Sequence, residues 1–116
     1  MSRKFFVLAF WLAAAFAFVM ATIPQPPALP GQPSDKVQHI LAFSVLASLA
    51  FTAWPWKRWP LIVVGLSAFG ALIEIVQLIP ALHRDGDCID WLADTAAVLV
   101  VAGITYFRRR YISSSL

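Results

Sequence analysis

Four long apolar stretches dominate this sequence and constrain what it can fold into. The first, residues 5–23, contains 19 residues without a charged side chain. As a helix rising about 1.5 Å per residue it would be about 28 Å long, close to the roughly 30 Å hydrocarbon core of a bilayer. The other three stretches are residues 37–54, 60–79 and 89–107. The pattern predicts an all-α membrane bundle of four transmembrane helices, with residues 1–116 forming a single domain.

The composition argues against the main alternatives. Of the 116 residues, 60% are hydrophobic and 13% are charged, whereas soluble domains are about 45–50% apolar and about 25% charged. A disordered chain would need low hydrophobicity and a high net charge. The single cysteine, Cys88, excludes a disulfide within the chain. The net charge of +3 is explained by membrane orientation, so we expect no nucleic-acid partner.

The first stretch also has features of a secretory signal peptide. Arg3 and Lys4 precede the apolar run, and the small residue Ala21 lies near the end of the run. However, the run is longer than the roughly 7–15 apolar residues of a typical signal. We therefore expect it to form the first membrane span.

Lysine and arginine are distributed unequally between the two predicted sides of the membrane. In a four-span protein, the N-terminus, the connection between spans two and three and the C-terminus share one side. Those segments contain seven basic residues and no acidic ones: Arg3, Lys4, Lys57, Arg58, Arg108, Arg109 and Arg110. The opposite side contains only Lys36 and Arg84. Because basic residues favour the cytoplasmic side, the sequence predicts an N-in, C-in orientation.

Three of the four spans carry polar side chains that a membrane helix normally avoids. An ionisable group at the centre of a span costs about 2.5–3.5 kcal/mol on insertion scales, so such groups usually face protein or water. They come in three helical pairs: Asp35 with His39, Glu74 with Gln77, and Asp90 with Asp94. All three pairs fall in the predicted outer half of the membrane, with Lys36 and Arg84 just above them. We therefore expect three helices to bring these groups together at one level.

The order of these motifs resembles the VanZ-like family of small membrane proteins. The matching residues are Asp35-Lys36-x-x-His39, Glu74-x-x-Gln77, Arg84 and Asp90-x-x-x-Asp94, within residues 35–103. The resemblance implies a multi-pass protein of the bacterial cytoplasmic membrane, from a family associated with reduced susceptibility to the glycopeptide teicoplanin. It implies no particular reaction. The chain has Asp94 where the family commonly has Asn, and Ala97 where it favours Gly, so looser helix packing is expected at Ala97.

The polar groups form a candidate ligand-binding site at the outer face. Its predicted members are Asp35, Lys36, His39, Glu74, Gln77, Arg84, Asp90 and Asp94. One imidazole and three carboxylates (His39, Glu74, Asp90 and Asp94) could hold a divalent cation, which is the candidate cofactor. Lys36 and Arg84 could instead bind an anionic head group directly. A purely structural role, tying helices together, is the competing interpretation for the whole cluster.

Other polar residues have simpler structural interpretations. Asp35 and Asp87 could cap the second and fourth helices, with Asp90 then in the first turn. Ser44, Ser48 and Thr52 follow a four-residue spacing along the second span. Because small polar residues allow membrane helices to approach closely, we expect them to lie at a helix contact.

The expected function is recognition of a lipid head group or a cell-wall-related ligand, with membrane lipids as partners. One alternative is a non-catalytic accessory subunit of a larger membrane complex. Another is a metal-assisted hydrolase or transferase acting on a lipid-linked substrate. The sequence contains no recognisable nucleophile–base pair, zinc-binding spacing or phosphate-binding glycine loop, which favours a protein that is not an enzyme.

Overall fold

The computed structural model describes residues 2–23, 31, 34–82 and 87–115, and these residues are almost entirely helical. The elements are α1 (Arg3–Thr22), α2 (Asp35–Ala53), α3 (Trp59–Gln77), a short 3-10 helix η1 (Pro80–Leu82) and α4 (Cys88–Ser115). No strand occurs in the described part of the chain. All four α-helices are long and apolar enough to cross a membrane. The prediction of an all-α chain with four membrane-length helices is therefore confirmed.

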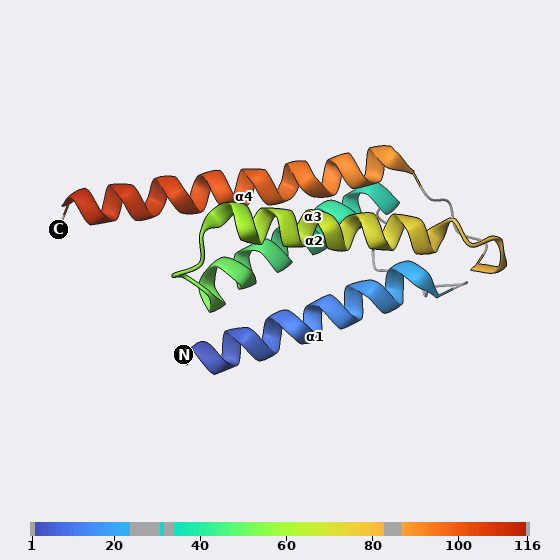
Figure 1. The fold of residues 1–116 in the computed structure, drawn as a ribbon, viewed down its shortest axis with the longest axis horizontal. Coiled ribbons are helices and arrows are strands. Elements are labelled where there is room, and N and C mark those ends of the chain that lie inside the picture. The colour runs from blue at the N-terminus through green and yellow to red at the C-terminus, as the bar shows by residue number, and fades with distance from the viewer. Residues whose placement is uncertain (1, 24–30, 32–33, 83–86, 116) are drawn as a thin grey trace.

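The four helices form an elongated antiparallel bundle of 54 × 27 × 27 Å. Both chain termini and the connection between α2 and α3 lie at one end, which we call the basic end (Figure 1). The start of α2, the end of α3 and the start of α4 lie at the other end, which we call the polar end. Helix α2 contacts all three of the others. Residues far apart in the sequence therefore meet around α2 at both ends.

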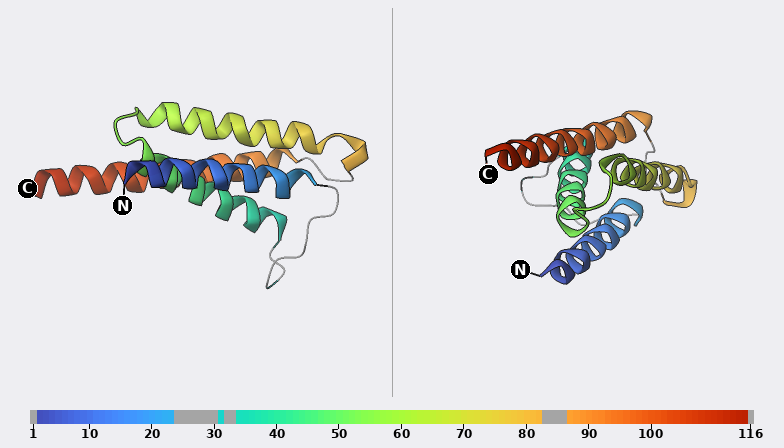
Figure 2. Two further views of the ribbon diagram at one scale, coloured as in Figure 1. Left: turned by 90° about the horizontal axis from the view of Figure 1, so that it is seen from below. Right: turned by 60° about the vertical axis from the view of Figure 1, so that its left-hand side comes forward.

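Helix α4 is longer than the span predicted from the sequence. It has 28 residues and continues to Ser115, beyond the expected limit at Phe107. Residues 108–115 contain neither proline nor glycine, so no helix-breaking residue ends it earlier. Its C-terminal turns extend past the rest of the bundle at the basic end (Figure 2).

The capping residue expected from the sequence is found at the start of α4 but not at the start of α2. Ser34, with an extended backbone at φ −62° and ψ 158°, caps α2 by accepting a hydrogen bond from the amide of Val37. The prediction that Asp35 is the cap is wrong, because helical geometry already begins at that residue. At α4 the prediction is confirmed: Asp87 accepts a hydrogen bond from the amide of Ile89 at 2.9 Å, and Asp90 lies in the first turn.

The apolar core lies where α2 meets its neighbours. It is built mainly from buried residues of α2, α3 and α4, including Phe43, Leu46, Ile73 and Val98. Helix α1 adds Phe10 to this core and exposes most of its other large apolar side chains. Exposed apolar side chains on a membrane-length helix are suited to contact with lipid, so α1 packs at the side of the bundle.

Small residues make the close contacts of α2, but not the ones expected. Ser48 and Thr52 donate hydrogen bonds to the carbonyl oxygens of Ser44 and Ser48, four residues earlier, and both are exposed. Their predicted place at a helix contact is wrong, because this bond to their own helix satisfies the hydroxyl without a partner helix. The fully buried Ala47 and nearly buried Ala50 occupy the contact instead.

Candidate functional site

A histidine and an aspartate from different helices meet at the polar end. Nδ1 of His39 on α2 lies 3.1 Å and 3.3 Å from the two carboxylate oxygens of Asp94 on α4. His39 is 7% exposed and Asp94 is 0% exposed. The expectation that these residues lie at the same depth is confirmed. The contact ties α2 to α4 through two buried ionisable groups.

Glu74 brings a third helix into the same place. Its Oε2 accepts a hydrogen bond from the backbone amide of Asp87 at 2.7 Å. Its Oε1 is buried and has no hydrogen-bond partner within the part of the chain that the structure describes. An unsatisfied buried acceptor costs about 1–3 kcal/mol, so a buried oxygen of this kind calls for an explanation. A proton, a cation or a ligand donor at this oxygen would provide one.

These three residues together form a candidate metal site. One ligand atom from each of His39, Glu74 and Asp94 can be chosen so that all three lie within 4.8 Å of one another. An imidazole nitrogen and two carboxylate oxygens are suitable ligands for a divalent cation. We call His39, Glu74 and Asp94 the polar cluster.

Asp90, predicted as a fourth candidate metal ligand, does not belong to this group of described residues. Its Oδ1 instead accepts a hydrogen bond from Nζ of Lys36 at 3.0 Å. The same Nζ lies 3.8 Å from a carboxylate oxygen of Asp87. The Lys36 side chain is 46% exposed, whereas that of Asp90 is 6% exposed. This ion pair joins the start of α2 to the start of α4 beside the polar cluster, so Asp90 is engaged by a lysine.

The remaining predicted site residues have different outcomes. Gln77 is buried, but its amide nitrogen donates to the carbonyl oxygen of Ala21 on α1 at 2.8 Å. Glu74 therefore bonds to the residue just before α4, whereas Gln77 bonds to α1. Arg84 lies outside the described residues, as does the side chain of Asp35. The site that the structure describes is thus the polar cluster with the adjacent Lys36–Asp90 ion pair.

Further contacts between α3 and α4, not predicted from the sequence, lie on the side of the polar cluster that is nearer the basic end. Nε1 of Trp91 on α4 donates to the carbonyl oxygen of Ser67 on α3 at 3.0 Å. The hydroxyl oxygens of Ser67 and Thr95 lie 3.0 Å apart. These two bonds join α3 to α4 about two helical turns from Glu74. The available sequence signal was the presence of hydroxyl residues in both apolar stretches, but it does not specify a pair.

Gly70 on α3 allows this helix to lie close to the side chain of Asp94 on α4. A Cβ atom at this position would lie 3.2 Å from Oδ2 of Asp94 and 3.4 Å from side-chain atoms of Phe43 and Trp91. Glycine therefore leaves the space into which the Asp94 carboxylate fits. The position lies one helical turn before Glu74, so the absence of a side chain here helps to bring α3 and α4 together at the site.

No protein-family model, no curated protein and no solved structure matches this chain. The function has to be argued from the geometry of the site itself.

Proposed function

We propose that this chain is a VanZ-like multi-pass protein of the bacterial cytoplasmic membrane that binds a lipid head group or a cell-wall-related ligand at its polar end. In the proposed N-in, C-in orientation the polar end faces outward. The basic residues at the opposite end support this orientation, because they would then lie in the cytoplasm.

The observation that carries the proposal is the buried polar cluster with an unsatisfied oxygen. His39, Glu74 and Asp94 come from three helices, and Glu74 Oε1 lacks a partner among the described residues. Interhelical hydrogen bonds in membranes contribute only about 0.6 kcal/mol on average. This is small beside the cost of burying several ionisable groups, about 2.5–3.5 kcal/mol each on insertion scales. Ligand binding accounts for the arrangement better than helix association does.

The residues at the site suggest how a ligand would be held. The polar cluster could hold a divalent cation, and such a cation would attract a phosphate or carboxylate group of the ligand. The half-exposed Lys36 lies beside the cluster and could contribute a positive charge to the same anionic group. Asp35 and Arg84 remain proposed members on the basis of the sequence.

The alternatives lead to different expectations. A metal-assisted hydrolase or transferase is the second candidate, because the same three ligand groups would suit a catalytic cation. It would require the cation for turnover of a lipid-linked substrate. An accessory subunit would be isolated only within a larger assembly, and the polar cluster would then only hold the helices together.

The proposal is tested by native mass spectrometry of the protein after gentle extraction from its own membrane. We expect the 12.8 kDa chain to carry a reproducible lipid, cell-wall precursor or divalent metal. Recovery only within a large assembly would favour the accessory-subunit alternative. A chain that carries no bound species would contradict the proposal.

Substitutions separate binding from folding. Glu74→Gln and Asp90→Asn should lose the bound species while the protein remains abundant and helical in the membrane. Ser48→Ala is the matched control, because Ser48 is exposed and bonds only to its own helix. If Glu74→Gln and Asp90→Asn both disappear from the membrane while Ser48→Ala persists, the polar cluster and the adjacent Lys36–Asp90 ion pair have a structural role and the proposal fails.

A further inference from the structure

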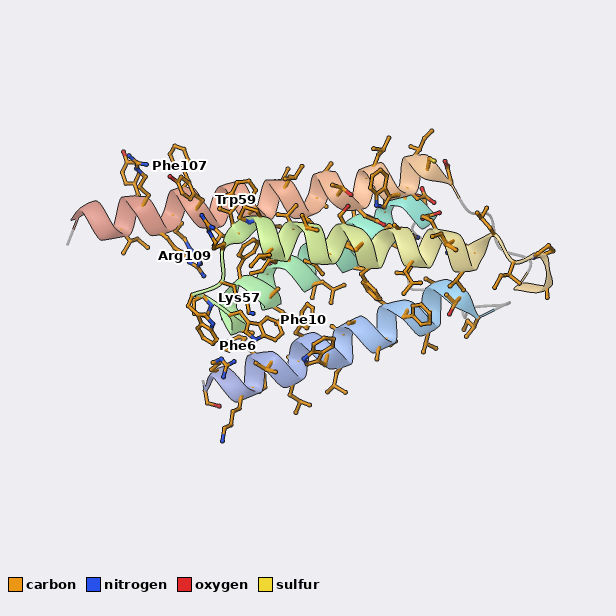
Figure 3. All side chains as sticks on the ribbon, in the orientation of Figure 1. Phe6, Phe10, Lys57, Trp59, Phe107 and Arg109 are labelled. Atoms are coloured by element: carbon orange, nitrogen blue, oxygen red, sulfur yellow. The ribbon has the colours of Figure 1, made fainter. Side chains whose placement is uncertain are left out.

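A second polar region lies at the basic end, far along the bundle from the polar cluster. A cavity of about 570 Å³ opens there between the α2–α3 connection, the start of α3 and the last part of α4. Four of its lining residues are cationic: Lys57, Arg58, Arg109 and Arg110. We call this cavity the basic pocket. In Figure 3, Lys57, Trp59 and Arg109 lie where the α2–α3 connection comes beside α4.

No carboxylate among the described residues neutralises the positive charge of the basic pocket. Its described lining contains no acidic residue, and the described carboxylates Glu74, Asp87, Asp90 and Asp94 all lie at the polar end. Within the described residues, the side chains of Lys57 and Arg58 make no hydrogen bond or ion pair. Four cations that share one cavity repel one another, so a bound anion would stabilise the arrangement.

Two of the four cations are held in place by hydrogen bonds. Arg109 donates from Nη2 to the carbonyl oxygen of Phe51 at 2.6 Å and from Nη1 to that of Pro55 at 3.5 Å. Nη1 of Arg110 donates to the hydroxyl of Tyr106 at 3.1 Å. These bonds fix part of the cationic wall, while Lys57 and Arg58 have no such restraint among the described residues. The pocket thus combines a positioned side with a side that can adapt to a ligand.

The start of α3 adds to the attraction for anions. Arg58 is the N-cap of this helix and makes no side-chain capping hydrogen bond. The helix therefore begins without a side-chain acceptor for its first amides, and the positive end of its dipole faces the pocket region. Trp59, the first residue of α3, itself lines the pocket.

The lining also contains an apolar part. Phe51 and Ala102 are buried core residues that line the cavity, whereas Trp59 and Tyr106 are about half exposed. Exposed tryptophan and tyrosine are typical of the zone where lipid head groups meet hydrocarbon. A small soluble anion would use only the charges, but a phospholipid would use the charges, the aromatic rim and the apolar base together.

We infer that the basic pocket binds the phosphate of an anionic phospholipid in the leaflet that surrounds this end. Arginine and lysine clusters between membrane helices are suited to such head groups. The planar guanidinium groups of Arg58 and Arg109 can each present two donors to phosphate oxygens. This site is separate from the polar cluster and does not depend on the function proposed for it.

Native mass spectrometry of the full chain in detergent micelles tests this inference, with phosphatidylglycerol and phosphatidylcholine added in turn. We expect the wild-type protein to retain phosphatidylglycerol in preference to phosphatidylcholine. The double variant Lys57→Gln/Arg58→Gln should bind phosphatidylglycerol roughly 30-fold more weakly. Its helical content should be unchanged, because neither side chain bonds to another described residue. The charge-preserving variant Lys57→Arg/Arg58→Lys should retain binding.

A matched double variant distinguishes the pocket from general charge attraction. Lys4→Gln/Arg108→Gln removes the same charge at the same end, but neither residue lines the pocket. It should weaken binding by less than about threefold, since charges further from the lipid are screened by salt and solvent. Equal losses in the two double variants would overturn the inference. So would equal binding of the two lipids by the wild-type protein, or complete displacement of phosphatidylglycerol by excess inorganic phosphate, which would identify a site for a soluble anion.

Discussion

The two ends of the bundle differ in the burial of their ionisable side chains. At the polar end, His39, Glu74 and Asp94 are buried and gathered from three helices. At the basic end, Lys57 and Arg58 are exposed and make no hydrogen bond to the rest of the described chain. A buried charge needs partners in the protein, because no water replaces them, whereas long basic side chains can reach water or head groups. Removal of a paired buried group, such as the Asp94 carboxylate, should therefore lower stability, whereas amide replacements that keep the side-chain shape, such as Glu74→Gln, should not. Substitutions at the basic end should mainly affect surface electrostatics.

The largest expected effect tests the buried side of this comparison. Asp94→Ala removes the carboxylate that contacts His39 Nδ1. We expect the free energy of unfolding to fall by about 3 kcal/mol, as for other broken buried pairs. Unfolding by sodium dodecyl sulfate in mixed micelles would measure this loss. Arg108→Ala, at the exposed end, should change stability by no more than about 0.5 kcal/mol. Equal effects of the two substitutions would remove the distinction between the ends.

A smaller effect is expected from filling the space beside the cluster. Gly70→Val would place atoms against Oδ2 of Asp94 and the rings of Phe43 and Trp91. Overpacking of this kind typically lowers stability by about 1–3 kcal/mol. Gly65→Val is the control on the same helix, since a Cβ at Gly65 meets nothing within 4 Å. Thermal unfolding of both variants in detergent would show whether close helix approach, and not glycine itself, is required at Gly70.

The smallest expected effect concerns two neighbouring arginines at the basic end, of which only Arg109 makes a described hydrogen bond. Arg109 bonds to the carbonyl oxygen of Phe51, which lies near the C-terminus of α2. Arg109→Gln should lower stability by about 1 kcal/mol, the usual size of a lost hydrogen bond. Arg108→Gln, which removes the same charge without a described bond, should be nearly neutral in the same unfolding assay. If both are neutral, the bond to Phe51 does not contribute measurably to the fold.

Much of the fold follows from hydropathy and helical spacing alone. An apolar run long enough to cross the bilayer predicts a helix almost regardless of its neighbours, because backbone groups in lipid must bond within the segment. The meeting of His39, Glu74 and Asp94 could be predicted for a related reason. Their depth follows from their distance to the ends of the apolar runs, and their polarity excludes the lipid-facing side.

Contacts between particular side chains could not be obtained in this way. The Ser67–Thr95 pair and the space beside Gly70 depend on how α3 rotates and crosses α4, and no local pattern encodes that rotation. Asp90 and Gln77 show the same limit within the predicted site. Both belong to the expected helical pairs, yet Asp90 bonds to Lys36 and Gln77 bonds to α1, and the spacing within a single helix does not specify which neighbouring element a side chain meets.

The contact between His39 and Asp94 also has a consequence for how the protein is made. The two residues are 55 positions apart, so at roughly 5–20 residues per second a ribosome needs about 3–11 s to add Asp94 after His39. During this interval α2 has no access to its partner on α4, and its polar end is expected to stay at the water interface or inside the insertion machinery. We therefore expect release of α2 into lipid to follow the arrival of α4, so that a later helix completes the insertion of an earlier one.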